Sequence, residues 1–260
     1  MGNLTLPVLT LCGRELTRFF RQRSRVIGSV VQPLMFWGLI GAGFNASFRP
    51  PGVPEGTSYA AYAYPGIIAM VLLFTAIFST ISVVNDRREG FLQGVLVAPV
   101  PRTSIVLGQA LGCTALATLQ GVLFLLLAPL AGIRVTTASA LAVTGVLILV
   151  SFGMSSLGLV IAWRLDSTQG FHAVMNMVLL PMWVLSGAFF PAAGVPGWLG
   201  WAMRVNPMTY GLAAIRRTLY LATPGAGSGT PDLGFSLWIT ILFGAAAFAA
   251  AVTVAVRKQV

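Results

Sequence analysis

A dense group of charged side chains lies between two long apolar segments of this chain. Four consecutive charged residues, Asp86 to Glu89, follow one apolar segment directly, and Pro99 and Pro101 precede the next. Charged residues make up only 8% of the chain, against roughly a quarter in soluble domains. Two carboxylates beside two guanidinium groups can form ion pairs and dock onto another molecule. We therefore expect the segment Asn85–Arg102 to lie outside the lipid and to contact a partner.

The remaining polar residues give little support to catalytic or metal chemistry. The single histidine, His172, has Asp166 six residues away but no nucleophile or further ligand beside it. Cys12 and Cys113 are unsuited to a disulfide or a metal site. The only lysine is Lys258, so a phosphate-binding loop of the form GxxxxGK[ST] is impossible. We expect no catalytic residue, metal or cofactor in this chain.

The charged group is expected to open a short amphipathic helix. Asp86 and Glu89 have the spacing of a capping box, in which two side chains close the first turn of a helix. An exposed apolar strip on such a helix favours a groove on a partner protein. The alternative is an ordinary charged loop whose strip lies against the membrane. The strip consists of Phe91, Leu92, Val95 and Leu96.

A second set of charges precedes the first apolar segment. Its arginines recur at spacings of four, three and four residues, on one face of a helix. The pattern predicts an interfacial helix over residues 10–25, with its apolar face on lipid and its guanidinium groups on phosphates. A simple orientation signal is the alternative. The basic face consists of Arg14, Arg18, Arg21 and Arg25, and the apolar face of Cys12, Leu16 and Phe19.

Six long apolar segments must position these charged groups. Hydrophobic residues make up 57% of the 260 positions, and each segment is long enough for a membrane-spanning helix of about 20 residues. The apolar runs are continuous, which favours helices over the alternating strands of a barrel. We predict an all-α membrane protein with a single domain, residues 1–260. The expected spans are Val26–Asn45, Tyr64–Val84, Ile105–Leu130, Ser139–Trp163, Phe171–Phe190 and Phe235–Val256.

The positive charges indicate the orientation of the chain. Six spans place both termini on one side, and that side holds eleven basic residues against five on the other. The positive-inside rule then places the termini and the Asn85–Arg102 segment in the cytosol. The net charge of +10 is therefore expected to set the orientation of the chain in the membrane. Its partner is expected to be membrane lipid rather than nucleic acid.

The segment before the last span is too apolar for a solvated loop. Residues 191–221 face outward in this topology and are rich in aromatic side chains, including Trp198, Trp201 and Tyr210. Aromatic side chains at this density are typical of the headgroup level of a membrane. Pro196 and Pro207 divide the segment, so we predict two short outer helices that re-enter the interface.

The predicted spans contain almost no ionisable side chains. Carriers driven by an ion gradient normally keep such a group within the bilayer, where it binds the driving ion. Selective channels usually show rings of carboxylates or a carbonyl-lined filter, and neither pattern occurs here. The energy for transport is therefore expected to come from outside the chain, unless the pore is passive.

Short motifs in a fixed order give the chain a family resemblance. The ordered set resembles the membrane-spanning subunit of type-2 ABC transporters, the permease family of drug, polysaccharide and teichoic-acid exporters, over nearly the whole chain. The motifs are Glu15 and Arg18 in the N-terminal helix, Gln32-Pro33, Tyr64-Pro65-Gly66, Asn85–Gly90, Ala98–Arg102, Leu185–Pro191 and Asn206–Tyr210.

The resemblance implies a transport subunit of the bacterial inner membrane rather than an enzyme. Such permeases form dimers, and each copy binds a separate cytosolic ATPase subunit that holds ATP and Mg. The cargo expected is amphipathic, drug-like or lipid-linked. The coupling helix would be about Asp86–Ala98, and the outer helices about Pro196–Leu221. The residues expected at the ATPase are Asp86, Arg87, Arg88, Glu89, Phe91, Leu92 and Val95, with Arg14, Glu15 and Arg18 of the N-terminal helix.

The cargo pathway is expected along the first, second and fifth spans. The residues expected there are Phe36, Phe74, Met177 and Trp183, for which core packing or lipid contact is the alternative. Two other functions stay open. A gradient-driven carrier would need an acidic residue within the membrane. A membrane scaffold or sensor paired with an ATPase would keep the charged loop but would not need the aromatic outer helices.

Overall fold

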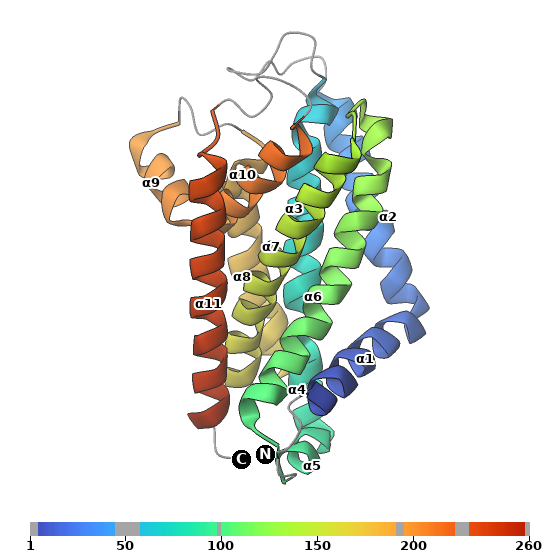
Figure 1. Cartoon of the computed structure of the whole chain (residues 1–260), viewed down its shortest axis with the longest axis vertical. Helices are drawn as coiled ribbons and strands as arrows, with labels where there is room; N and C mark the ends of the chain where they lie inside the picture. The colour runs from blue at the N-terminus through green and yellow to red at the C-terminus, as the bar shows by residue number, and fades with distance from the viewer. Residues whose placement is uncertain (1–4, 45–57, 98–99, 191–194, 222–228, 258–260) are drawn as a thin grey trace.

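The chain folds into a bundle of long helices. A computed structural model describes residues 5–44, 58–97, 100–190, 195–221 and 229–257, and these residues include no β-strand. The long helices run side by side, with α9 and α10 near one end (Figure 1). In chain order the elements are α1 (Thr5–Arg21), α2 (Arg23–Phe44), α3 (Tyr59–Ser79), α4 (Ile81–Arg88), α5 (Phe91–Val97), α6 (Arg102–Leu127), η1 (Ala128–Ala131), α7 (Thr137–Arg164), α8 (Thr168–Trp183), η2 (Val184–Ala188), α9 (Gly197–Val205), α10 (Pro207–Leu219) and α11 (Leu233–Arg257).

All six predicted spans are confirmed. Five agree with the observed segments to within three residues at each described boundary. The second begins earlier, at Tyr59, because the Ser58 side chain accepts a hydrogen bond from the Ala61 amide and caps the helix there. The observed segments are Val26–Gly43, Tyr59–Arg88, Arg102–Ala131, Thr137–Arg164, Thr168–Ala188 and Leu233–Arg257.

α3 lies at the centre of the bundle. It packs against α2, α6, α7, α8 and α10. Apolar side chains lie on every side of it, including the buried Ile67, Ile68 and Leu72, as expected for a helix surrounded by other helices. The Tyr64 hydroxyl donates a hydrogen bond to the Phe124 carbonyl at 2.5 Å. α3 is therefore the element against which the surrounding helices of the bundle are positioned.

The charged group lies at the end of α4, not at the start of a helix. Asp86 is in the last turns of α4, and α5 begins only at Phe91. Gly90 separates the two helices with a φ of +77°, a left-handed conformation that glycine adopts readily. The predicted capping box of Asp86 and Glu89 is therefore wrong, because the helix of the second span continues past Asp86.

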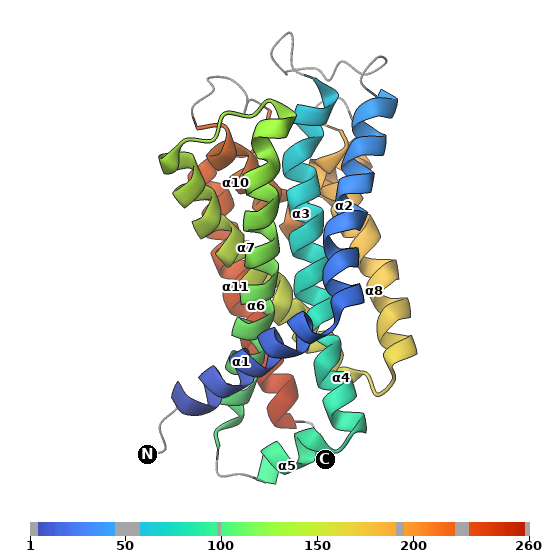
Figure 2. The same ribbon diagram turned by 90° about the vertical axis from the view of Figure 1, so that its right-hand side faces the viewer.

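α1 crosses the bundle at the end where α4 and α5 lie, and it packs against α6 (Figure 2). The chain bends at Gln22 before α2 begins, so the helix predicted over residues 10–25 starts and ends earlier than expected. Of the face expected on lipid, Phe19 is buried against the protein, as are Val8, Leu11 and Glu15. Cys12 and Leu16 are half-buried, and their contact with lipid stays a prediction. Leu6, Leu9 and Phe20 are instead the apolar side chains left exposed.

Two glycines of α6 explain the close approach of α1. A Cβ atom on Gly108 would lie 3.0 Å from the Leu11 Cβ and 3.1 Å from the Val8 carbonyl oxygen. A Cβ atom on Gly112 would lie 2.9 Å from the Glu15 Cβ. Small residues one helical turn apart let two backbones come together, so the position of α1 depends on them.

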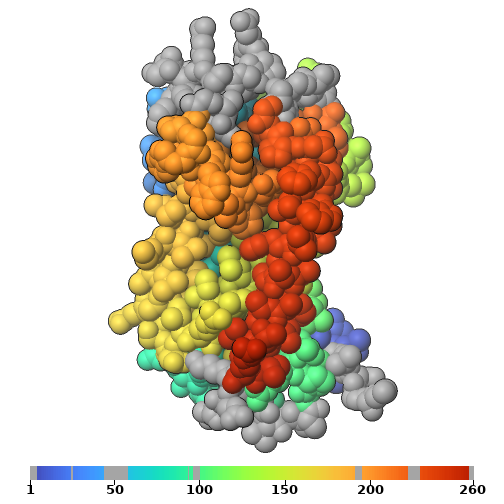
Figure 3. All heavy atoms as spheres, turned by 90° about the vertical axis from the view of Figure 1, so that its left-hand side faces the viewer, coloured from blue at the N-terminus to red at the C-terminus, as the bar shows by residue number. Residues whose placement is uncertain are grey.

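Two short helices precede the last span, as predicted. α9 leaves Trp198 and Trp201 exposed, and it lies on the surface beside α11 (Figure 3). α10 is buried against α3, α7 and α11. The Asn206 side chain accepts a hydrogen bond from the Met208 amide at 3.0 Å and caps α10. Their depth in a membrane stays a prediction, and residues 191–194 lie outside the described part of the chain.

Candidate functional site

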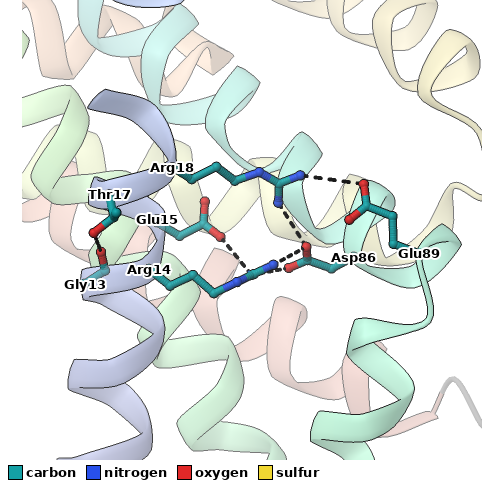
Figure 4. A network of polar contacts seen from close by, with 7 residues as sticks. All are labelled: Gly13, Arg14, Glu15, Thr17, Arg18, Asp86 and Glu89. Carbon is teal, nitrogen blue, oxygen red and sulfur yellow. Dashed lines mark hydrogen bonds and ion pairs between the residues drawn. The ribbon is translucent and has the colours of Figure 1, made fainter. Parts of the chain in front are cut away.

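Asp86 is the centre of a polar network that joins α4 to α1 (Figure 4). Arg14 donates from Nη1 to Oδ2 at 2.5 Å and from Nη2 to Oδ1 at 2.6 Å. Arg18 donates from Nη1 to Oδ1 at 2.9 Å. The Glu15 carboxylate lies 3.7 Å from Arg14, and the Glu89 carboxylate 4.0 Å from Arg18. The two charged groups of the sequence, 72 positions apart at Arg14 and Asp86, thus form one cluster.

Two carboxylates of this network are withdrawn from the surface. Asp86 is 1% exposed, and Glu15 is buried against α6. Burial raises the pKa of the Glu15 carboxyl above its ordinary value. Bidentate pairing of a guanidinium with a carboxylate fixes geometry as well as adding energy. Asp86 and Glu15 therefore hold α1, α4 and α6 in a fixed arrangement, and neither presents its side chain to a partner here.

Arg87 binds the end of α7. Its guanidinium donates to the carbonyl oxygens of Trp163 and Leu165, both at 3.1 Å, and to the Asp166 carboxylate at 2.9 Å. Arg102 likewise donates to two carbonyl oxygens in the last turn of α11, at 2.9 and 3.0 Å. The last carbonyls of a helix lack partners within it and attract cations. These helix-end contacts were not expected from the sequence.

The exposed part of the predicted docking group is smaller than expected. Arg88, Glu89 and Phe91 are exposed, whereas Leu92 is 2% exposed and belongs to the core. The expectation of an exposed apolar strip is therefore wrong at Leu92, because α5 folds back on α4 and turns this side chain inward. Val95 is half-buried, and the Leu96 side chain lies outside what the structure describes.

Phe91 connects the exposed surface to the network. Its ring is 41% exposed, and the Arg14 guanidinium lies over the ring, 3.9 Å from its centroid. A cation over an aromatic face is attracted by the ring quadrupole, by about 0.5–1 kcal/mol at exposed sites. A contact made at Phe91 would therefore act directly on the residue that holds Asp86.

A cavity of about 540 Å³ lies between α2, α3 and α8. α2 and α8 both pack on α3, which forms the floor between them. Exposed residues of α2 and α8, including Gly28, Gln32 and Asn176, form its rim. Its lining consists of Phe19, Gly28, Ser29, Gln32, Pro33, Phe36, Met70, Val71, Phe74, Thr75, Phe78, Ser79, Gln120, Asn176, Leu180 and Trp183.

Three of the four predicted pathway residues line this cavity. Phe36 and Phe74 place their rings edge-on to Trp183, with centroids 6.2 and 6.4 Å from it. The Trp183 indole is fixed by donating to the Gly66 carbonyl at 2.8 Å. Met177 is 81% exposed and does not line this cavity, so its place on a cargo pathway stays a prediction. Whether cargo uses the cavity stays a prediction.

Uncharged polar side chains of the cavity are not anticipated by the charge pattern. Thr75 of α3 donates a hydrogen bond to the Gln120 side chain of α6, and both line the cavity. The signal available in the sequence is the pair of glutamines, Gln109 and Gln120, inside an otherwise apolar span. Polar side chains within a span normally bond to a neighbouring helix.

These features define a class of protein. The described part of the chain has six membrane-length helices, a cavity with an apolar and polar lining between α2, α3 and α8, and a charged cluster at one end. Among the described residues, no group of three metal-ligating side chains comes together. Such an arrangement can accommodate a molecule in the cavity. The fold and site are those of a helical membrane transporter.

The chain belongs to the ABC-2 type transporter family, whose sequence pattern matches residues 7–220. It is 30% identical to the transport permease ycf38 of Porphyra purpurea, over 79% of this chain and 71% of that protein. It is 26% identical to nodulation protein J of Rhizobium meliloti (strain 1021), over 74% of this chain and 73% of that protein. It is 27% identical to the multidrug ABC transporter permease YbhR of Escherichia coli (strain K12), over 74% of this chain and 52% of that protein.

Proposed function

We propose that this chain is the permease subunit of an ATP-driven exporter and that a separate ATPase subunit supplies the energy. The chain belongs to a transporter family, and its only lysine is Lys258, which rules out a phosphate-binding loop of its own. The hydrolysis of ATP, with its Mg ion, is therefore assigned to the partner. This chain supplies the pathway.

The observation that carries the proposal is the link between an exposed helix and the rest of the bundle. α5 presents Phe91 beside the exposed Arg88 and Glu89, and Phe91 contacts Arg14. Arg14 holds Asp86 of α4, and α1 packs against α6 and bends into α2. A displacement of α5 would therefore be transmitted to α2, which forms one wall of the cavity, through fixed ionic and packing contacts.

The cavity supports amphipathic cargo, since aromatic rings and uncharged polar groups share its lining. We assign the membrane of residence to the bacterial inner membrane, with the end that carries α1, α4 and α5 in the cytosol, because the arginines gather there. α2 leaves a row of large apolar side chains exposed beside the cavity, including Ile27, Met35 and Leu39. A second copy of the chain and membrane lipids are the proposed neighbours of this face.

The test is affinity purification of the tagged chain from its native membrane in mild detergent, with mass spectrometry. Wild type should retain a stoichiometric subunit that carries ATPase motifs. Phe91→Ala should lose that subunit or its cargo-stimulated ATP hydrolysis while melting within a few degrees of wild type, because it removes only a part-exposed contact of about 0.5–1 kcal/mol.

Leu92→Ala is the matched variant on the next residue. Leu92 is buried in the core, so its truncation should lower the free energy of unfolding by about 2–5 kcal/mol. A low yield of folded permease would then accompany any loss of ATPase. Recovery of wild-type permease without any ATPase, or full activity of the Phe91→Ala complex, would contradict the proposal.

A further inference from the structure

Three consecutive side chains in the last turn of α4 contact different neighbours. Asp86 binds two arginines of α1. Arg87 donates to two carbonyl oxygens at the end of α7 and to a carboxylate just beyond them. Arg88 donates to the hydroxyl of Thr168, the first residue of α8, at 3.4 Å. This single turn therefore joins α1 on one side to the connection between α7 and α8 on the other.

The elements on these two sides lead directly into two walls of the cavity. α1 is separated from α2 by Gln22 alone, and α8 follows α7 after three residues. Ser167 caps α8 by accepting a hydrogen bond from the Gly170 amide at 3.0 Å. α2 and α8 both pack on α3 and line the cavity. The end of α4 is therefore linked to both walls through short connections.

The Arg87 guanidinium is committed to the connection between α7 and α8. Its side chain is only 15% exposed, and it donates to the carbonyl oxygens of Trp163 and Leu165. It also lies 5.5 Å from the centroid of the Trp163 ring. A guanidinium presents its donors in a rigid planar fork, so it can hold several acceptors in one geometry. Arg87 therefore fixes both the distance and the direction between α4 and this connection.

The other end of the same charged loop is held by a different helix. Arg102, the first residue of α6, donates to the carbonyl oxygens of Ala255 and Val256 at the end of α11. No described side chain of α11 lines the cavity. The two arginines make the same kind of contact with a helix end, but only Arg87 lies on a connection that leads into α8.

We propose that Arg87 is a positioning residue for the α8 wall of the cavity, and that the last turn of α4 sets the separation of α2 and α8. Asp86 holds the side that leads into α2, and Arg87 holds the side that leads into α8. A displacement of α4 then moves both walls rather than α2 alone. This inference rests on the proposed function, because it treats α5, which packs against α4, as the place where force arrives. It adds a second route from α5 to the cavity.

The test measures the separation of α2 and α8 in the full-length chain in lipid nanodiscs. Ile27→Cys on α2 and Ala173→Cys on α8 carry spin labels, with Cys12 and Cys113 replaced. Both labelled positions are exposed and do not line the cavity. Dilution with excess unlabelled chain restricts double electron–electron resonance to distances within one chain. Wild type should show one narrow distance. Arg87→Gln should raise the ratio of displaced to held α8 by roughly 10-fold, as expected for the loss of one charge-assisted hydrogen bond.

Arg102→Gln is the matched control, because it removes a guanidinium from the last carbonyls of α11 and leaves the contacts of Arg87 in place. It should leave the distance unchanged. Arg87→Lys keeps the charge but loses the planar fork, so its displaced population should lie between those of wild type and Arg87→Gln. This variant also serves as the test if Arg87→Gln does not fold.

A second pair of labels distinguishes positioning from a general loosening of the bundle. Leu111→Cys on α6 and Leu141→Cys on α7 are exposed positions that do not line the cavity. The distance between them should be the same in Arg87→Gln and in wild type, because neither α2 nor α8 carries a label in this pair.

Three results would overturn the inference. They are an unchanged distance between α2 and α8 in the folded Arg87 variants, the same displacement in Arg102→Gln, and equal broadening of the distance between the labels on α6 and α7. The distance measurement needs no ATPase, whereas the proposed function is judged by ATPase recovery. An unchanged distance together with a retained ATPase would therefore reject the role of Arg87 and leave the permease function standing.

Discussion

Asp86 accepts three charge-assisted hydrogen bonds from two arginines of α1 while being almost fully buried. Asp86→Asn should leave Arg14 and Arg18 without their counter-charge. Breaking a buried pair costs about 3–5 kcal/mol, and we expect about 2–3 kcal/mol here, because the arginine side chains are partly exposed. The melting temperature in detergent should fall by roughly 4–10 °C.

The control for this prediction is the same substitution at an exposed aspartate. Asp166 pairs with Arg87 at the surface, where an ion pair is worth about 0–1 kcal/mol. Asp166→Asn should therefore shift the melting temperature much less than Asp86→Asn. Equal shifts for the two variants would show that the network around Asp86 does not hold α1 to α4.

Glu15 gives a prediction about pH. Burial raises the pKa of its carboxyl above the ordinary value of about 4.3. Between that value and the raised folded-state pKa, the folded chain binds more protons than the unfolded chain, so this group lowers stability as the pH rises. Glu15→Gln should therefore melt above wild type at about pH 8, and the difference should vanish on acidification towards the ordinary pKa of about 4.3.

The exposed carboxylate of Glu89 provides the comparison. Glu89→Gln removes only a surface pair with Arg18, so it should change the melting temperature little. If Glu15→Gln melts at or below wild type across the whole range, the buried carboxyl is stabilised in its charged form by Arg14, and the proposed pH effect is wrong.

The limits of prediction from sequence are clear at single residues. The charged group and its neighbour Phe91 were identified by composition, because charges are so rare in this chain. The burial of Asp86 and Leu92 was not expected, since it depends on the arginines of α1 reaching Asp86 and on α5 packing against α4. Local spacing does not reveal a partner 72 positions away.

At the scale of elements, the contact of α1 with α6 depends on Gly108. Gly108→Ala would place a methyl group 3.1 Å from the Val8 carbonyl oxygen, a backbone atom that can move only with the whole helix. Overpacking typically costs about 1–3 kcal/mol, and the higher helix propensity of alanine returns about 0.5–1 kcal/mol. We expect a net loss of about 1 kcal/mol, measured as a lower melting temperature.

Gly145→Ala on α7 is the matched control, because a Cβ atom at Gly145 meets nothing within 4 Å. Only the propensity effect applies there, so this variant should melt slightly above wild type. A higher melting temperature in both Gly108→Ala and Gly145→Ala would mean that α1 does not pack tightly on α6.

The positions of the spanning helices could be predicted well, because each needs a long apolar run and little else. Their ends were less predictable: the start of α3 depends on a side-chain cap at Ser58, and α4 continues the second span to Arg88. The cavity was anticipated only through three aromatic side chains, and Gln120 was missed. Which faces of three separate helices meet is a property of packing, which periodicity does not encode.

For the whole molecule, we expect one orientation in the membrane, with the end that carries α4 and α5 in the cytosol. Glu89 and Leu130 are exposed and lie at opposite ends of the bundle. Single-cysteine variants at these positions, with Cys12 and Cys113 replaced, can be treated on intact cells with a maleimide that does not cross membranes. Leu130→Cys should react, and Glu89→Cys should react only after the membrane is opened. The reverse pattern would invert the proposed topology.

If α5 receives force from a separate ATPase, a photo-crosslinker at position 91 should lie against that subunit. Phe91→benzoylphenylalanine is illuminated in native membranes, and the adduct is identified by mass spectrometry. Met177, which is exposed beside the bundle, carries the same crosslinker as the lipid-facing control. We expect an adduct between position 91 and a subunit with ATPase motifs, and no such adduct from position 177. Adducts of position 91 with lipid only, or the same product from both positions, would contradict it.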